Sequence, residues 1–462
     1  MRKYFSALAA LVLAASALGA QSFQQALFLD GYRLGYRYNP AIQNESGFIG
    51  VGQWENQTHN NFGAASFLYP RDGELVTALH SSVPAETFLG SLQDDNYVVG
   101  NINFNLVSYG WRKDASYHTI EANIRAMYSA SVPREVFAIA KLGTAAKNYD
   151  LSGMGLAGNA IVDLAYGYSH NFSDIVSIGA RAKLLVGVEA LNYRVSRFGM
   201  SFSEELYKAD IEADLDLTSR WNKIRSDENG YLNLLDLSAR DRWKLPSGVG
   251  LAMDLGVVVT PFEGFTLSAS VLDLGGMLWY YGNAGKSQGT AEFTGVKNLS
   301  MEEIQGGNIM DQFSGVLDDL LGSVRIKEAK SRTSLEAVPL NVNLGIKYEM
   351  PFYRALALGV TGNYIGFNGL SNLFGNNLGR NGMSYLEVRG ALAWNPWSWL
   401  GITGGGGYGS YGPVWNAAAN VALGRFRLTV GYSDGFGGTI PYRSTPLEPN
   451  AKMVTVGLTY DI

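Results

Sequence analysis

The chain has 462 residues with no cysteine, and only 17% of the residues are charged. Soluble globular domains carry about 25% charged residues, so the chain is poor in charge although its hydrophobic content, 47%, is ordinary. The net charge of −5 comes without any basic cluster, which excludes a nucleic-acid-binding surface.

The first 20 residues have the features of a secretory signal peptide. Arg2 and Lys3 give a positive start, residues 7–18 form a short apolar core, and small residues follow up to Ala20. No later stretch reaches the roughly 18 uninterrupted apolar residues of a membrane-spanning helix. We therefore expect residues 1–20 to be removed on export and the mature protein to lack a transmembrane helix.

Beyond residue 47, apolar and polar residues alternate with period two in many stretches of about ten residues. Such stretches occur at 118–128, 159–170, 176–190, 249–259, 338–348, 385–394 and 426–433. Their polar faces hold Gly, Asn, Ser and Thr with single charges, whereas a soluble sandwich would place many Lys and Glu there. The pattern favours an apolar face towards lipid and a polar face towards a closed lumen, because only helices and closed barrels satisfy their backbone hydrogen bonds inside a bilayer.

Tight turns and long loops connect these stretches. Tight turns are predicted at 113–116, 171–174, 261–264, 351–354, 395–399 and 423–425, and long loops at 130–157, 191–246, 282–335, 367–383 and 437–450. Short turns at one end and long extracellular loops at the other are typical of outer-membrane barrels. Aromatic residues beside the tight turns should form a girdle at the inner membrane interface. They are Tyr166, Tyr168, Phe172, Phe262, Phe265, Phe352, Tyr353, Trp394, Trp397 and Trp399.

With both termini in the periplasm, strands are predicted near 47–54, 99–111, 116–130, 157–170, 175–190, 247–260, 265–280, 336–349, 355–366, 384–394, 400–411, 414–422, 425–436 and 451–462. The count of about 14 is even, as a closed antiparallel barrel requires. The last strand, which ends in MVTVGLTYDI, should pair with the first, with Tyr460 and Ile462 at its terminal apolar positions. The stretch 209–218 breaks this count, so we assign it to a hairpin that leaves the membrane with the far end of 175–198.

The segment before the first strand contains Asn39-Pro40-Ala41 within GYRLGYRYNPAIQNESG (31–47). This early motif resembles the N-terminal segment of FadL-type fatty-acid transporters and of the related shuttle barrel of the type IX secretion system. The patches at 178–187, 270–279 and 332–348 resemble an uncharacterised outer-membrane family of the same superfamily.

This resemblance covers most of the chain and implies the architecture of those relatives. The barrel would comprise residues 47–462, and residues 21–46 would plug its lumen. The resemblance carries over no ligand-contacting residue, and the stretch 335–339 is longer than the corresponding family patch.

Two short motifs of enzymes occur, but neither has the sequence context that its chemistry needs. GMGLAG (153–158) matches a dinucleotide-binding loop, yet an alternating strand follows it instead of a helix. GYSDG (431–435) matches a nucleophile elbow around Ser433, but no helix signal follows there either. The four histidines are scattered and lack metal-site spacing. We therefore expect no enzyme activity, no cofactor and no metal site at these residues.

Four acidic residues alternate along the stretch 209–218 and form an acidic ladder. Asp210, Glu212, Asp214 and Asp216 place four carboxylates on one face of a strand. Calcium favours clustered oxygen ligands, so a cation site is one interpretation. The favoured interpretation is a solvated face of an extracellular hairpin, near Lys208 or Arg220.

Charged residues on the polar faces of the strands should point into the lumen. They are Glu121, Arg125, Arg181, Lys183, Glu189, Asp254, Glu387 and Arg389. Because a buried unpaired charge is costly, we expect these side chains to pair and to hold the plug. A role of some of them in selectivity is the alternative.

Helical periodicity occurs only in the predicted loops. In 308–324 an apolar stripe is formed by Ile309, Phe313, Val316, Leu317, Leu320 and Leu321. Residues 133–143 and 84–92 give weaker helical signals. Such helices either cap the barrel mouth, which we favour, or form an apolar capture groove.

The sequence therefore predicts an all-β transmembrane antiparallel barrel in the bacterial outer membrane, surrounded by lipid. The leading hypothesis is passage or binding of a small hydrophobic compound, without chemistry, past a plug that shifts near Asn39-Pro40-Ala41. The alternative is a scaffold that binds a secreted protein or lipopolysaccharide through its loops.

Overall fold

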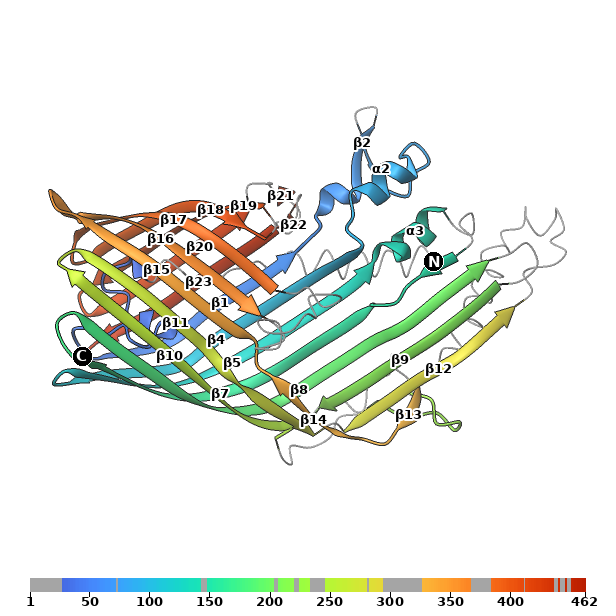
Figure 1. Cartoon of the computed structure of the whole chain (residues 1–462), viewed down its shortest axis with the longest axis horizontal. Coiled ribbons are helices and arrows are strands. Elements are labelled where there is room, and N and C mark those ends of the chain that lie inside the picture. Colours follow the sequence, from blue (N-terminus) through green and yellow to red (C-terminus); the bar gives the residue numbers. More distant parts are fainter. Residues whose placement is uncertain are drawn as a thin grey trace.

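The computed structural model describes residues 27–71, 74–142, 148–202, 207–219, 224–232, 246–280, 282–293, 326–366, 384–410, 412–435, 439–440, 445–446 and 450–462. In this part of the chain, 14 antiparallel strands close into a barrel, seen from the side in Figure 1. In ring order they are β1 (Phe48–Asn60), β4 (Asp95–Lys113), β5 (Ser116–Pro133), β7 (Gly155–Asn171), β8 (Val176–Phe202), β10 (Gly248–Phe262), β11 (Phe265–Tyr280), β15 (Leu340–Met350), β16 (Tyr353–Gly366), β17 (Ser384–Trp397), β18 (Leu400–Gly409), β19 (Gly412–Leu423), β20 (Phe426–Gly435) and β23 (Asn450–Asp461). The all-β class and the predicted strand count are confirmed.

The ring closes between the first strand and the last. β23 pairs with β1 on one side and with β20 on the other. The Ile462 N–H donates to the Gly47 carbonyl at 3.0 Å, and the Tyr460 ring packs edge-on against Phe426 with centroids 5.0 Å apart. The C-terminal strand is thus paired to its final residue, as closure of a barrel without free edges requires.

The two ends of the barrel differ in their connections. Short connections lie at one end, here called the turn end, at residues 114–115, 172–175, 263–264, 351–352, 398–399 and 424–425. All of these were predicted as tight turns. Gly264 and Gly424 have positive φ angles of 83° and 63°, which glycine adopts without steric cost. The opposite end is called the loop end.

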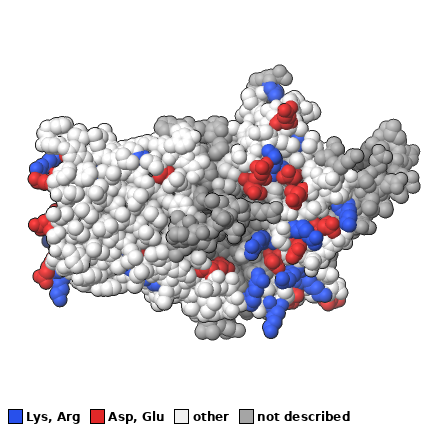
Figure 2. Space-filling model, in the orientation of Figure 1, with Lys and Arg blue, Asp and Glu red and all other residues white. Residues whose placement is uncertain are grey.

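The outer face of the barrel is apolar. On the face that Figure 2 shows, charged side chains are sparse along the barrel and gather at the turn end and beyond the loop end. Leu344, in the middle of β15, is 57% exposed. At the turn end nine of the ten predicted aromatic residues are also exposed and Phe265 is half-buried. The rings of Trp397 and Trp399 stack with centroids 5.2 Å apart. An apolar band flanked by aromatic rings is the surface of a transmembrane barrel.

Beyond the loop end, β8 continues into a sheet that stands clear of the barrel (Figure 1). β9 (Tyr207–Ser219) pairs with the far part of β8, which confirms the predicted hairpin at 209–218. β12 (Asn283–Phe293), β13 (Lys327–Ala329) and β6 (Asn148–Asp150) extend this loop-end sheet. β12 and β13 fall in a stretch predicted as loop. The sequence NAGKSQGTAEF of β12 is small or polar up to its last residue, Phe293, so it gives no alternating signal.

Short elements also pack at the loop end, above the barrel. α2 (Ala85–Gly90) and α3 (Arg134–Leu142) correspond to two of the predicted loop helices. They share a phenylalanine-rich core with residues of 62–92 in the same chain. The ring centroids of Phe67 and Phe137 in this core lie 5.5 Å apart. The remaining elements are η2 (Gly35–Arg37), η3 (Ala64–Ser66), β2 (Leu68–Arg71), β3 (Glu74–Thr77), β14 (Thr333–Ala337), β21 (Thr439–Ile440) and β22 (Thr445–Pro446).

Two predictions fall outside the described residues. These are the signal peptide, 1–20, and the helix 308–324 with its stripe Ile309, Phe313, Val316, Leu317, Leu320 and Leu321. Among the described residues, no helix is both long and apolar enough to cross a membrane.

The depth dependence of a charge on the outer face tests its contact with lipid. Leu344→Arg places a cation in the middle of the apolar band, and we expect it to lower the free energy of unfolding in bilayers by about 2–4 kcal/mol. Phe352→Arg, at the turn end, should cost only about 0–1 kcal/mol. Equal effects of the two substitutions in equilibrium unfolding, followed by tryptophan fluorescence, would contradict a lipid-facing outer wall.

Candidate functional site

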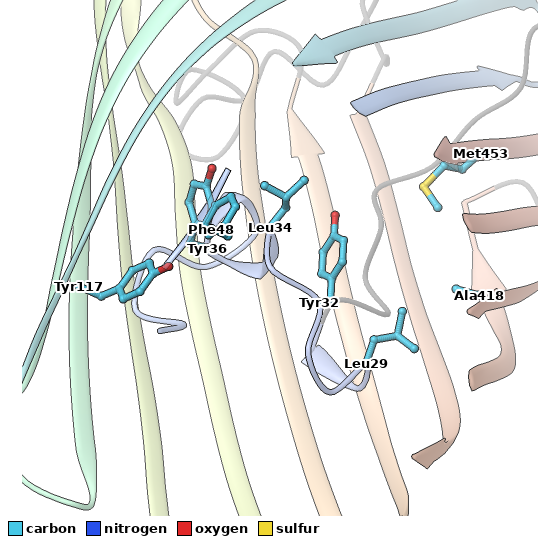
Figure 3. Close-up of a cluster of buried hydrophobic side chains, with 8 residues drawn as sticks. All are labelled: Leu29, Tyr32, Leu34, Tyr36, Phe48, Tyr117, Ala418 and Met453. Atoms are coloured by element: carbon cyan, nitrogen blue, oxygen red, sulfur yellow. The ribbon is translucent and has the colours of Figure 1, made fainter. Parts of the chain in front are cut away.

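Residues 27–46, here called the plug, lie inside the barrel and are anchored by an apolar cluster (Figure 3). The cluster joins four plug residues to four residues of the wall. It comprises Leu29, Tyr32, Leu34 and Tyr36 with Phe48, Tyr117, Ala418 and Met453, all of them buried. Because the wall residues come from β1, β5, β19 and β23, the anchor lies beside the closing seam.

The predicted plug motif lies against a part of the wall that contains two glycines, Gly179 and Gly256. The Asn39 amide donates to the Val257 carbonyl at 3.0 Å and to Ser268 Oγ at 2.8 Å, and Asn39 Oδ1 accepts from the Ala41 N–H at 2.9 Å. A Cβ atom on Gly179 would collide with the Pro40 backbone, and one on Gly256 would collide with Asn39. Glycine in β8 and β10 is therefore what lets this motif approach the wall so closely.

Wall side chains also satisfy the plug backbone. Five of these donors are asparagine amides or serine hydroxyls, and Arg112 and Tyr117 donate as well, to the Asn44 and Ser46 carbonyls. The contacts of the five are Ser270 and Asn343 to the Tyr38 carbonyl (2.6 and 3.1 Å), Ser177 to Ala41 (2.8 Å), Asn395 to Phe28 (3.2 Å) and Asn420 to Asp30 (3.1 Å). A plug with little regular secondary structure must find such partners, because buried backbone carbonyls are rarely left unpaired. This accounts for the Asn- and Ser-rich polar faces noted in the sequence.

The sequence GYRLGYRY repeats Gly-Tyr-Arg with a spacing of four, and one wall residue contacts both copies. Gln53 Oε1 accepts from Arg37 at 3.1 Å, and Gln53 Nε2 donates to the Tyr32 hydroxyl at 3.0 Å. Gln53 lies at a bulge of β1 between Val51 and Trp54, which aims it into the lumen. The repeat was the one available signal for this contact.

The other arginine of the repeat connects the plug to the C-terminal strand. Arg33 forms a bidentate pair with Asp461, with N–O distances of 2.7 and 3.0 Å. Asp461 also accepts from Arg427 of β20 at 2.7 Å. Planar guanidinium groups suit such two-point pairs. Plug and closing seam therefore share one carboxylate.

Tyr36, Arg37 and Tyr38 connect the plug to charges on the wall. The Tyr36 hydroxyl donates to Glu121 at 2.8 Å, and its ring lies under the Arg181 guanidinium, 5.3 Å from the centroid. Burial raises the pKa of the Tyr36 hydroxyl to about 12, so it stays protonated and donates. The Tyr38 hydroxyl donates to Glu55 at 2.8 Å, and Arg37 Nε lies 3.7 Å from Glu121.

Buried ion pairs then run across five adjacent strands of the wall, β5, β7, β8, β10 and β11. This luminal charge network follows the order Asp163, Arg125, Asp273, Lys183, Asp254, Arg181 and Glu121. Its successive N–O distances are 2.8, 2.9, 2.8, 2.8 and 3.1 Å before the Arg181–Glu121 contact. Every charge thus has a counter-charge, which buried ions require. Five of the seven were predicted to face the lumen; Asp163 lies on the same face of its stretch and could have been included.

The luminal position of Asp273 could not have been predicted, because a bulge in β11 turns its side chain into the lumen. The pairing of β10 with β11 shifts between Met253 and Leu255, and Asp273 adopts a φ of 61°, which is rare outside glycine. Its N–H donates to Asp254 Oδ1 at 2.8 Å, which stabilises the bulge. Strained residues of this kind cluster at functional sites.

Glu387 and Arg389 form a second buried cluster on the opposite wall. Arg389 contacts Glu387 at 3.0 Å and donates to Ser433 at 2.8 Å. Ser433 lies within β20, so GYSDG is strand and not a nucleophile elbow. Glu189 differs from expectation: a bulge after Gly187 shifts the alternation, and Ala190 instead joins the luminal residues.

An apolar layer lines one side of the lumen, on the loop side of the luminal charge network. Its members, here called the luminal apolar layer, are Ile161, Leu185, Ala190, Ala252, Met277, Trp279 and Val338, with Met127 packed against them. A cavity of about 90 Å³ lies between this layer and the plug, and Met127, Arg125 and Tyr38 are among its lining residues. A second cavity of about 490 Å³ lies on the turn-end side of the plug, bordered by Leu29, Gln43 and Lys347. The plug thus separates two chambers.

The acidic ladder on β9 lies between basic strands. Arg194 is opposite Asp214 and Arg197 is opposite Glu212 on β8. From the other side, Lys286 Nζ lies 3.4 Å from Asp214. Among the described residues, no group of three or more His, Cys, Asp or Glu side chains is arranged to hold a metal ion. This arrangement favours the solvated hairpin face.

Comparison with known proteins assigns the chain to a family. A family described as a family of unknown function (DUF5723) matches residues 40–432, and the chain belongs to it. No curated protein matches the chain. This agrees with the expected membership in an uncharacterised family.

Three solved structures with low sequence identity are among those similar to the chain. The toluene transporter TbuX of Ralstonia pickettii is 10% identical with a TM-score of 0.45, over 96% of this chain and 98% of that one. A FadL homologue of Pseudomonas aeruginosa is 11% identical with a TM-score of 0.46, over 97% and 98% of the two chains. The translocator domain of the autotransporter NalP of Neisseria meningitidis is 10% identical with a TM-score of 0.35, over 91% of each chain. A FadL homologue is thus among the similar structures, as expected from the sequence.

A side chain at Gly179, where the plug motif contacts the wall, should displace the plug from the wall. Gly179→Val places a side chain where the Pro40 backbone lies, so we expect protease cleavage within 27–46 to become much faster while the barrel stays folded. Gly404→Ala is the control, because its Cβ would meet its nearest neighbour, Asn416 O, at an ordinary 3.5 Å. Equal rates of protease cleavage within 27–46 in the two variants would contradict the close contact between the plug motif and Gly179.

Removing the shared carboxylate of the luminal charge network should be costly. Glu121→Gln deprives Arg181 and Arg37 of one counter-charge, and breaking a buried pair costs about 3–5 kcal/mol of unfolding free energy. Glu263→Gln, which breaks an exposed pair with Arg354 at the turn end, should change stability little. The free energy of unfolding of both variants, measured in bilayers, tests this expectation. An unchanged free energy of unfolding in Glu121→Gln would contradict it.

Proposed function

We propose that this member of DUF5723 binds small hydrophobic compounds at its loop end and passes them across the outer membrane without chemistry. The luminal apolar layer carries this proposal. Barrels that conduct water and ions have polar interiors, whereas here buried Trp279, Met277 and Leu185 interrupt a lumen that is otherwise rich in Asn and charge. Such a layer favours solutes that gain free energy by leaving water.

The position of this layer suggests how a solute would reach the plug. The cavity between layer and plug is lined by Met127 on one side and by Arg125, Lys183 and Asp273 on the other. A compound that entered it would replace water beside the luminal charge network and change the balance of its ion pairs. Because Glu121 and Arg181 hold Tyr36, a rearrangement there would loosen the plug, which would then shift about Asn39-Pro40-Ala41. A ligand can shift the plug only as far as it binds the shifted state more tightly.

The loop-end sheet favours a second candidate, a scaffold that docks another molecule. Its exposed face carries both signs of charge, with Arg194 and Arg197 beside the acidic ladder and Lys286 on the far side. Mixed charge on a projecting sheet suits recognition of a secreted protein or of lipopolysaccharide. In either case we infer export by the predicted signal peptide and residence in the outer membrane.

Two luminal substitutions with opposite expected signs test the leading proposal. Trp279→Ala opens the luminal apolar layer and should speed entry of the apolar fluorophore N-phenylnaphthylamine into intact cells several-fold. Met277→Lys charges the same layer and should slow entry several-fold. Trp415→Ala, on the outer face, is the control for tryptophan loss.

General damage to the barrel would move both luminal variants in one direction. Uptake that is the same in all variants and in cells lacking the protein would overturn the transport proposal. If uptake is unchanged while a protein partner is lost from a Lys286→Glu variant in mild detergent, the scaffold is supported instead.

A further inference from the structure

The outer wall carries a depression of about 750 Å³ at the level of the apolar band. Outward residues at equivalent height form rows across the paired strands, and one row runs Val107, Ala122, Leu164 and Leu184. In the next row, Ala182 lies beside Tyr166. The small alanines form the floor, and the larger neighbours stand above it. All of these side chains face the space that lipid occupies around a transmembrane barrel.

A row of aromatic rings borders the depression on its turn-end side. Trp111 stacks on His118 at 5.0 Å, and His118 packs against Tyr168 at 5.3 Å. His118 Nδ1 is 2.9 Å from the Tyr166 hydroxyl, so the row joins the lining of the depression directly. This ring row therefore has an apolar side towards the barrel middle and a polar side towards the turn end.

The polar side of the ring row gathers groups that suit an anion. Lys113 ends β4 opposite Ser116, two residues beyond Trp111 on the same outward face. Ser116 Oγ lies 2.8 Å from His170 Nδ1. Two of the four histidines of the chain, His118 and His170, thus lie at this one interface. Lysine, serine and histidine together supply donors for a phosphate oxygen.

We infer that this part of the wall binds one phospholipid from the leaflet at the turn end. Its acyl chains would lie in the depression over Ala122 and Ala182, and its phosphate would meet Lys113, Ser116 and His170. His118 and Ala122 are four residues apart on β5, or about 13 Å at 3.3 Å per residue, which fits an acyl chain below its headgroup. The site is continuous with the lipid-facing band and polar at one end only, and a phospholipid has the same polarity.

Native mass spectrometry of the purified protein in mild detergent tests this inference. The probes are dioleoyl phosphatidylglycerol and dioleoylglycerol, which share acyl chains and differ in the phosphate headgroup. Ala182→Phe fills the depression and should weaken binding of both lipids several-fold. Lys113→Gln should weaken phosphatidylglycerol binding several-fold and leave dioleoylglycerol binding unchanged.

A matched control lies on the far side of the barrel. Ala419→Phe, outward on β19, adds the same ring away from the depression and should bind both lipids like the unaltered protein. Equal binding by the Ala182→Phe and Ala419→Phe variants would overturn the site. Loss of both lipids alike in Lys113→Gln would overturn the assignment of the phosphate.

Discussion

The carboxylate of Glu121 holds two groups from the wall, Arg181 and the Asn123 amide, and two from the plug at once, and the rest of the lumen depends on these contacts. Arg181 reaches it from β8, while the Tyr36 hydroxyl and the Arg37 guanidinium reach it from the plug. Because a buried charge is stable only beside its counter-charge, the network through Asp254, Lys183 and Asp273 must stay complete. The luminal apolar layer lies on the loop side of this network, and the plug lies on its turn-end side.

Closure of the barrel and seating of the plug are physically linked. Asp461, next to the C-terminus, pairs with Arg33 of the plug and with Arg427 of β20. The plug anchor also packs on Phe48 and Met453, which come from the two strands of the seam. A chain whose last strand was unpaired would therefore lose plug contacts as well as backbone hydrogen bonds.

Much of the fold could be predicted because its cause is local. Alternation in stretches such as 118–128 reports which face meets lipid, and turn residues report where strands end, so strand count and closure followed. Bulges do not have such a local signal. Asp273 and Glu189 both lie at irregular pairings, where one extra residue reverses the alternation. β12 was missed because its residues, which are mostly small or polar, do not alternate with apolar ones. The Gln53 contact depends on a tertiary match for which the Gly-Tyr-Arg repeat is the one signal in the sequence.

The central claim is that the plug must move for an apolar compound to pass. The chain has no cysteine, so a single introduced pair can lock the plug. Asn39 and Ser268 touch at 2.8 Å, and Asn39→Cys with Ser268→Cys would tie the plug motif to β11. We predict that cells producing this variant admit N-phenylnaphthylamine only after reduction, and no faster than cells lacking the protein while the disulfide is intact. Equal, protein-dependent uptake in the oxidised and reduced states would contradict a moving plug.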